Sequence, residues 1–303
     1  MAFHEMYRRQ VALLIRTLPF VAVEDIFALK GGTAINLFIR DLPRLSVDID
    51  LTYLPVQPRA ASLAAINAGM TRIAAAVKAF IPGAAIAEGK HEGAIVKLLV
   101  RADGVQIKIE VTPVLRGCVF EPELRTVSPV VDTEFGFAEM RVVSFPDLYA
   151  GKIVAALDRQ HPRDLFDVRD LLATEGIDDP IRRAFIVYLL SHDRPMSEVL
   201  APTRKDITEE FMKRFQGMTA EPVSLDDLVA TREELIAAIV GQMPDTHRRF
   251  LVAFEHGEPD WSLLGVPGAP NLPAVKWRQQ NLNKLAAAKR DRLVARLEEV
   301  LGV

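Results

Sequence analysis

The feature that most constrains the fold is a change of hydrophobic period partway along the chain. Between about residues 84 and 143 apolar residues tend to recur at every second position, which is the period of β-strands. From Pro146 onward only helical spacing is found, and proline is favoured in the first turn of a helix. We therefore expect a domain of mixed helices and strands over residues 1–145 and an all-helical domain over residues 146–303.

Shorter patterns subdivide both domains. Asp103-Gly104 lies between two alternating stretches and indicates a β-hairpin. The expected elements of the first domain are helices at 5–18, 34–38 and 58–80 and strands at 25–30, 47–53, 95–100 and 105–111. The expected helices of the second domain are 146–158, 163–173, 181–191, 206–216, 225–243, 246–256 and 274–300, with a Gly- and Pro-rich loop over 257–273.

Two aspartates lie on one face of the expected strand 47–53. Asp48 and Asp50 are two residues apart, and side chains at that spacing point the same way from a strand. Like charges so close together repel each other unless a cation lies between them. Carboxylate oxygens suit Mg²⁺, which typically binds one or two protein carboxylates together with substrate phosphates. The pair therefore predicts a magnesium site for phosphoryl chemistry.

A glycine pair, Gly31-Gly32, precedes these aspartates at the junction of a strand and a helix. Glycines let the backbone approach a ligand closely, and the first N–H groups of a helix favour an anion such as a triphosphate. Thr33 adds a hydroxyl. Glu110 is the best candidate for a further metal ligand, and it shares its strand face with Lys108. Each feature alone is more typical of an ordinary turn or a solvated strand, whereas their combination indicates a nucleotide site.

These residues carry a family resemblance. LKGGTAIN at 29–36 and RLSVDIDL at 44–51 resemble the motifs of polymerase β-type nucleotidyltransferases, and more narrowly those of the AbiEii toxins of type IV toxin–antitoxin systems. The resemblance implies an α+β fold, in which a polymerase β-like nucleotidyltransferase domain with a mixed sheet is followed by an all-helical C-terminal domain. Residues of this chain that match the narrower motif are Arg44, Ser46, Asp48 and Asp50.

A second block, residues 147–168, resembles the helical signature of the same group, a lysine followed by Arg-Asp-x-x-Asp. It implies that Lys152 and Asp167 are catalytic together with the aspartate pair, and that Lys152 places positive charge on the triphosphate. Asp167 would orient Lys152 or act on the acceptor hydroxyl, and Asp164 competes for this role or merely pairs on its helix. The nucleotide-binding residues implied are Gly31, Gly32, Thr33, Ser46 and Lys152.

The resemblance also implies a reaction and partners. An acceptor hydroxyl would attack a nucleoside triphosphate (NTP), pyrophosphate would leave, and a cognate antitoxin would be encoded alongside. Members of the group have been linked to the 3′ end of tRNA, so tRNA is the expected acceptor. A basic C-terminal stretch with Trp277 would suit an RNA end, although a solvated helix face is an equal alternative. Its members are Lys276, Arg278, Lys284, Lys289, Arg290 and Arg292.

Two other functions stay open. One is a nucleotidyltransferase that acts on a small molecule or a protein side chain, which the basic stretch disfavours. The other is a non-catalytic binding module of the same fold, against which the intact Asp48, Asp50 and Lys152 argue. The chain has neither a GxxxxGK[ST] nor a GxGxxG loop, so P-loop and Rossmann sites lack their main signal.

Composition excludes several further classes. The one cysteine, Cys118, leaves no disulfide framework and fits a reducing cytoplasm. The N-terminus lacks the order of a signal peptide, and no run of about 18 uncharged apolar residues predicts a membrane span. The net charge is −3, so nucleic-acid binding would depend on a local patch.

Overall fold

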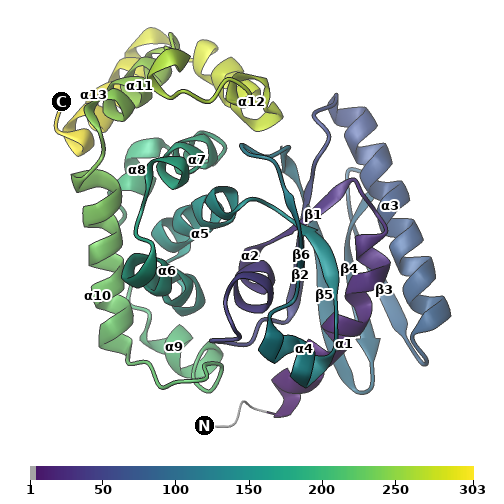
Figure 1. Ribbon diagram of the computed structural model, residues 1–303. Helices are drawn as coiled ribbons and strands as arrows, with labels where there is room; N and C mark the ends of the chain where they lie inside the picture. The colour runs from purple at the N-terminus through teal and green to yellow at the C-terminus, as the bar shows by residue number, and fades with distance from the viewer. Residues whose placement is uncertain (1–4) are drawn as a thin grey trace. The chain divides into compact units, whose positions relative to one another are not determined.

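The computed structural model describes residues 5–303 (Figure 1). The chain forms two compact units. The first unit contains the chain up to Ser144 together with residues 215–222, and the second contains residues 145–214 and 223–303. Residues 1–4 of the expected first domain lie outside the described part. The return of residues 215–222 to the first unit has no counterpart in the sequence-based expectation of two consecutive domains.

A seven-stranded mixed sheet lies at the centre of the first unit, in the order β3-β4-β5-β2-β1-β7-β6. In this sheet β2 runs parallel to β5 and antiparallel to β1, so the strand with the two aspartates has a neighbour on each side. The strands are β1 Phe27–Lys30, β2 Asp48–Tyr53, β3 Ala85–His91, β4 Ala94–Ala102, β5 Val105–Arg116, β6 Glu123–Thr126 and β7 Glu139–Val142.

One face of the sheet is apolar and is covered by two long helices, α1 and α3 (Figure 1). Phe27 of β1 packs on Gly69 of α3, where an added Cβ would lie 2.9 Å from the Phe27 ring. Phe27 is directly opposite Tyr53 of β2, so both residues point to this face. Because side chains alternate along a strand, Asp48 and Asp50 point to the other face. The helices of this unit are α1 Glu5–Ala22, α2 Gly31–Ala34, α3 Arg59–Phe80 and α4 Pro129–Phe135.

The segment between β1 and β2 carries the glycine pair. The helix begins at Gly31 itself, as α2, and continues as a π-helical turn over Ile35–Ile39, where a helix at 34–38 is expected. The following loop is held by the returning segment 215–222, since the amide of Leu45 donates to the carbonyl of Met218 at 2.9 Å. The loop before the aspartates is therefore fixed by residues far away in the sequence.

The expected hairpin is present. Ala102 and Val105 pair at its end, and the two turn residues, Asp103 and Gly104, both have positive φ, at 52° and 72°. This is the conformation that an Asp-Gly turn favours between two twisted strands. The turn sets the register of β4 against β5.

The second unit is helical throughout, apart from its connecting segments. Its helices are α5 Phe145–Arg159, α6 Pro162–Thr174, α7 Asp179–Leu190, α8 Met196–Leu200, α9 Thr208–Arg214, α10 Leu225–Ile236, α11 Asp245–His256, α12 Pro273–Asn283 and α13 Ala287–Leu301, with a π-helical turn at Ala237–Gly241 and short 3₁₀ turns at Trp261–Leu263 and Ala269–Asn271.

The expectation of a single helix over 274–300 is wrong. The chain leaves the helical conformation between Asn283 and Ala287, and two helices result. No glycine or proline marks the break. It follows from packing, because Val294, Leu297 and Leu301 of α13 are buried while the helix lies against α8 and α11.

Among the described residues, only α3 is long and apolar enough to cross a membrane, judged by length and composition. Its inner face is buried, and the residues concerned are Ser62, Ile66, Gly69, Met70, Ile73, Ala74 and Val77. That face packs on β4 and on Phe27, as in a core helix. We therefore assign α3 to the core of the first unit.

Candidate active site

The sheet register assembles a row of charged side chains across four strands on the face that carries the aspartates. Lys97 of β4 is directly opposite Glu110 of β5, and Glu110 is opposite Asp50 of β2. Asp50 in turn is opposite Lys30 of β1. Residues directly opposite each other point to the same face of a sheet. The row therefore reads lysine, glutamate, aspartate, lysine, with the two carboxylates as neighbours at its centre.

Asp48 belongs to the next row, where it is opposite Lys108 of β5. The Lys108 Nζ lies 2.7 Å from Glu110 Oε2 and 3.9 Å from Asp48 Oδ2. Lys97 reaches the other oxygen of the same glutamate, with Nζ 2.9 Å from Glu110 Oε1. Lys108 thus lies between two carboxylates, one from each row.

These contacts favour the charged forms of Glu110 and Lys108. Burial alone would raise the pKa of Glu110, but hydrogen bonds from Lys108 and Lys97 hold it below its ordinary value. Partial burial alone would lower the pKa of Lys108, yet the hydrogen bond to Glu110 and the charges of Asp48 and Asp50 raise it. Burial lowers the pKa of Lys30, a shift opposed by the negative charge of Asp50.

Gly31 and Gly32 lie directly against the charged face. A Cβ at Gly31 would be 2.7 Å from Asp50 Oδ2, and Gly31 has φ +75°, a left-handed conformation that favours glycine. A Cβ at Gly32 would be 2.6 Å from the Arg44 guanidinium and 3.0 Å from Ser46 Oγ. The glycines are thus required by close approach to the neighbouring side chains, as well as by the turn.

Thr33 and Ser46, both expected to bind the nucleotide, are buried. The Thr33 hydroxyl lies 3.0 Å from Ser46 Oγ and donates to the carbonyl of Asp48. Thr33 is 0% exposed, so its side chain ties the glycine turn to β2. Contact between its hydroxyl and phosphate stays a prediction, and the geometry favours a positioning role.

Arg44 is a further buried charge beside the glycine pair. It is 2% exposed and donates from Nη1 to the carbonyl of Leu45 at 2.9 Å. A bridge between Arg44 and Thr219 fixes its backbone to the returning segment 215–222. The sequence motif marks Arg44, but the element that fixes it is apparent only in the fold.

In the second unit Lys152 of α5 is buried with two carboxylates from α6. Its Nζ lies 2.9 Å from Asp164 Oδ1 and 2.9 Å from Asp167 Oδ2, and the Asp167 side chain is 0% exposed. Asp164 also binds Arg159 at 2.8 Å. The two aspartates are three residues apart, on one face of the helix. Both of the competing aspartates therefore hold Lys152.

The positive charges of this cluster favour the ionised form of Asp164. Burial alone would raise the pKa of Asp164, but the positive charges of Lys152 and Arg159 hold it below its ordinary value. Complete burial of Asp167 favours a role in orienting Lys152 over direct action on an acceptor hydroxyl.

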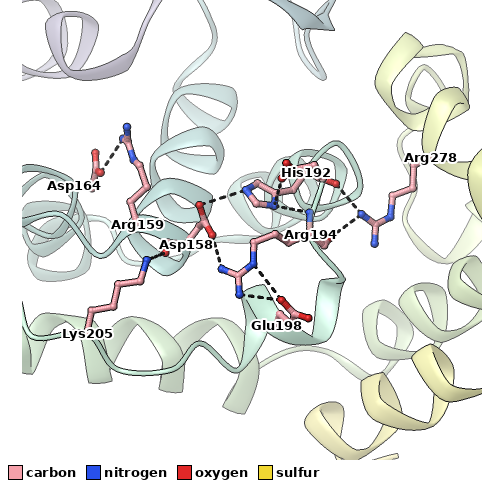
Figure 2. Close-up of polar contacts among 9 residues, drawn as sticks. Asp158, Arg159, Asp164, His192, Arg194, Glu198, Lys205 and Arg278 are labelled. Atoms are coloured by element: carbon pink, nitrogen blue, oxygen red, sulfur yellow. Dashed lines mark hydrogen bonds and ion pairs between the residues drawn. The ribbon is translucent and has the colours of Figure 1, made fainter.

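The prediction that Arg278 is part of a basic RNA-binding surface is wrong. Arg278 is buried, and its Nη1 donates to the carbonyls of His192 and Arg194 at 2.7 and 3.0 Å (Figure 2). Arg194 continues the network to Asp158 and Glu198. Arg278 is therefore a structural connection between α12 and the segment after α7. The other basic residues of the stretch are exposed or half-exposed, and Trp277 is 57% exposed.

Lys97 and Lys30 are charged neighbours of the site that the sequence analysis does not single out. The sequence does contain a signal for Lys97. A two-residue turn at 103–104 pairs Ala102 with Val105, and the same register along the two strands places Lys97 opposite Glu110. No local signal marks Lys30, because its position beside Asp50 depends on the pairing of β1 with β2.

The comparisons with known proteins show that the chain is a nucleotidyltransferase. The family model of the nucleotidyl transferase AbiEii toxin, type IV TA system, matches residues 12–281, and the chain belongs to this family. It is also similar to a solved structure, MenT4, a nucleotidyltransferase toxin from Mycobacterium tuberculosis H37Rv. The TM-score is 0.58 with 16% sequence identity, over 91% of this chain and 93% of that chain. At this identity the likeness shows the fold alone. The comparison with curated proteins found no match.

Family membership sets the general function. The protein is a nucleotidyltransferase toxin that uses an NTP and has an antitoxin partner. The observed sheet and helices, with the structural likeness to MenT4, confirm the expected α+β fold, a mixed sheet followed by a helical region. The non-catalytic alternative is thereby disfavoured.

Proposed function

We propose that the protein transfers a nucleoside monophosphate from an NTP to the 3′ end of tRNA in a Mg²⁺-dependent reaction, in the cytoplasm. The observation that carries the proposal is the placement of Gly31 against Asp50 in a member of this family. A backbone turn in contact with a carboxylate brings a phosphate-binding element and a metal-binding element together.

The donor set fits magnesium. Asp48 and Asp50 offer oxygen ligands from one strand face, and the Asp48 side chain is 37% exposed. Among residues 5–303, no three His, Cys, Asp or Glu side chains form a ready metal cage. The remaining ligands would come from substrate phosphates and water, as is usual for Mg²⁺. A metal ion bound here would neutralise charge on the reacting phosphoryl group.

The other residues act by binding and positioning. The backbone of Gly31 and Gly32 binds phosphate. Ser46 lies next to Gly32 and is held there by Thr33. The role proposed for Lys152, from the family signature, is to neutralise charge on the leaving pyrophosphate. Asp164 and Asp167 fix its ammonium in place, and a fixed charge needs little reorganisation during the reaction.

The exposed basic residues of α12 and α13, with Trp277, are proposed to bind RNA. This proposed RNA surface consists of Lys276, Trp277, Lys284, Lys289, Arg290 and Arg292. Arg278 is removed from it because its guanidinium is bound to backbone carbonyls.

A labelling assay tests the proposal. The purified protein is incubated with total tRNA, Mg²⁺ and each α-labelled NTP in turn, beside an Asp48→Ala variant. Label that enters tRNA with the wild type and not with the variant supports the proposal and identifies the base. Label that enters only small molecules or protein would refute tRNA as acceptor while leaving the enzyme class unchanged.

A further inference from the structure

Lys108 of β5 places its ammonium group between two carboxylates of the site. It is bound to Glu110 at 2.7 Å and faces Asp48 at 3.9 Å. In a three-carboxylate site that binds two metal ions, a shared cation would lie between such carboxylates. In this chain a lysine occupies the space between Asp48 and Glu110.

Both carboxylate oxygens of Glu110 are bound to lysines. One of its oxygens accepts from Lys108 and the other lies 2.9 Å from Lys97 Nζ. Each of its two oxygens thus faces an ammonium group, so its negative charge is already matched from both sides. A divalent cation that used Glu110 would have to displace Lys108 from its closest partner.

The aspartate pair and the four charged residues that the register places in the same two rows have formal charges that sum to zero. The carboxylates are Asp48, Asp50 and Glu110, and the lysines are Lys30, Lys97 and Lys108. With Glu110 bound to lysines, Asp48 and Asp50 are the carboxylates of this group left to bind a metal ion. Two carboxylates suffice for one Mg²⁺ with substrate phosphates.

We propose that Lys108 replaces the second metal ion of this site: one divalent cation binds at Asp48 and Asp50, and the Lys108 ammonium, held by Glu110, supplies the other positive charge. The inference rests on the proposed metal dependence and contradicts the expectation that Glu110 is a metal ligand. A fixed ammonium in this position counters the charge of Asp48 permanently, whereas a second Mg²⁺ would have to be recruited with each substrate.

Counting bound Mn²⁺ tests the inference independently of the acceptor. Mn²⁺ alone is titrated into the full-length protein, and free and bound ions are distinguished by electron paramagnetic resonance. The wild type should bind one ion at the site, and Asp48→Ala should lose it. In Lys108→Met a second ion should bind at least about tenfold more tightly than in the wild type, because a unit positive charge about 4 Å away has been removed. Spin coupling between the two ions should appear with it.

Two matched variants complete the test. Lys97→Met removes the other lysine bound to Glu110, one strand further from Asp48, and should still bind one ion. Lys108→Arg keeps a cation and should also bind one ion. Two ions in the wild type, or a second-ion affinity that is the same in Lys108→Met and Lys97→Met, would overturn the inference. Absence of any bound Mn²⁺ in the wild type would refute both this inference and the metal dependence, whereas failure of transfer to tRNA would leave it standing.

Discussion

Lys152 and Asp167 form a buried ion pair between α5 and α6, with Nζ and Oδ2 2.9 Å apart. Asp164, on the same helix face as Asp167, binds the same ammonium group. A family signature that reads as a set of catalytic residues is thus also a structural element of the second unit. Its variants must be judged by stability as well as by activity.

Lys152→Met should lower the free energy of unfolding by about 3 kcal/mol, because it leaves two buried carboxylates without their shared cation. Arg159→Met is the control, since Arg159 binds Asp164 but its side chain is 63% exposed, and its loss should be below about 1 kcal/mol. Urea denaturation of both variants measures the difference. Equal losses would show that burial of the Lys152 cluster does not matter for stability.

Gly31→Ala should reduce transfer activity about 100-fold, because the new methyl group displaces Asp50 from its position. Gly83→Ala provides the control: Gly83 also has positive φ, +71°, but nothing lies within 4 Å of an added Cβ. Both variants should lose about 1 kcal/mol of stability from backbone strain. Steady-state rates together with melting temperatures separate the two effects, and full activity in Gly31→Ala would contradict the close approach.

Thr33→Val should lower stability by about 1–2 kcal/mol, since it removes the buried contacts of the Thr33 hydroxyl with the Asp48 carbonyl and with Ser46 Oγ. Thr33→Ser keeps the hydroxyl and should recover most of this loss. If Thr33 bound phosphate only, stability measured without nucleotide would be the same in wild type and Thr33→Val.

Stability should fall as the pH is lowered from about 6.5 towards 4, in part because of His161. Burial, followed by the charge of Arg163, lowers the pKa of His161 from 6.5 to about 4. The unfolded chain therefore takes up the proton first, so the stability present above pH 6.5 is progressively lost down to the folded pKa. Protonation would also end the hydrogen bond that Nδ1 accepts from the Arg163 amide.

His161→Asn should flatten this pH dependence, because asparagine can accept the same amide hydrogen bond at a helix N-terminus without titrating. After allowance for the partial exposure of His161, the difference between pH 7 and pH 4.5 should shrink by about 1 kcal/mol. Denaturant titrations of both proteins at the two pH values measure it. Parallel curves would show that carboxylates alone carry the effect.

Neutralising Lys276, Lys284, Lys289 and Arg292 to glutamine should weaken tRNA binding. The slope of log affinity against log salt concentration should become shallower by about 0.7 for each phosphate that is no longer neutralised. Arg278→Met, only two residues from Lys276, should instead lower the melting temperature, because it removes hydrogen bonds to two backbone carbonyls. Binding isotherms at several salt concentrations test the first expectation. An unchanged salt slope in the four-residue variant would place the RNA elsewhere.

Local patterns predicted much of the first unit. The alternation at 47–53, the Asp-Gly turn and the alanine-rich stretch at 58–80 each correspond to an observed element. These patterns depend on residues close in sequence, whose geometry the backbone sets directly. The one-helix expectation for 274–300 failed because its break depends on packing against α8 and α11.

The sequence by itself determined that Asp48 and Asp50 share a strand face, that a glycine pair precedes them, and that a helical signature follows. Only the tertiary structure decided what surrounds them: Lys108 beside Asp48, Lys30 beside Asp50, and the burial of Lys152 and Arg278. The reason is physical. Side-chain direction along one strand follows from covalent geometry, whereas neighbours across strands and between helices depend on register and packing among residues far apart in the chain.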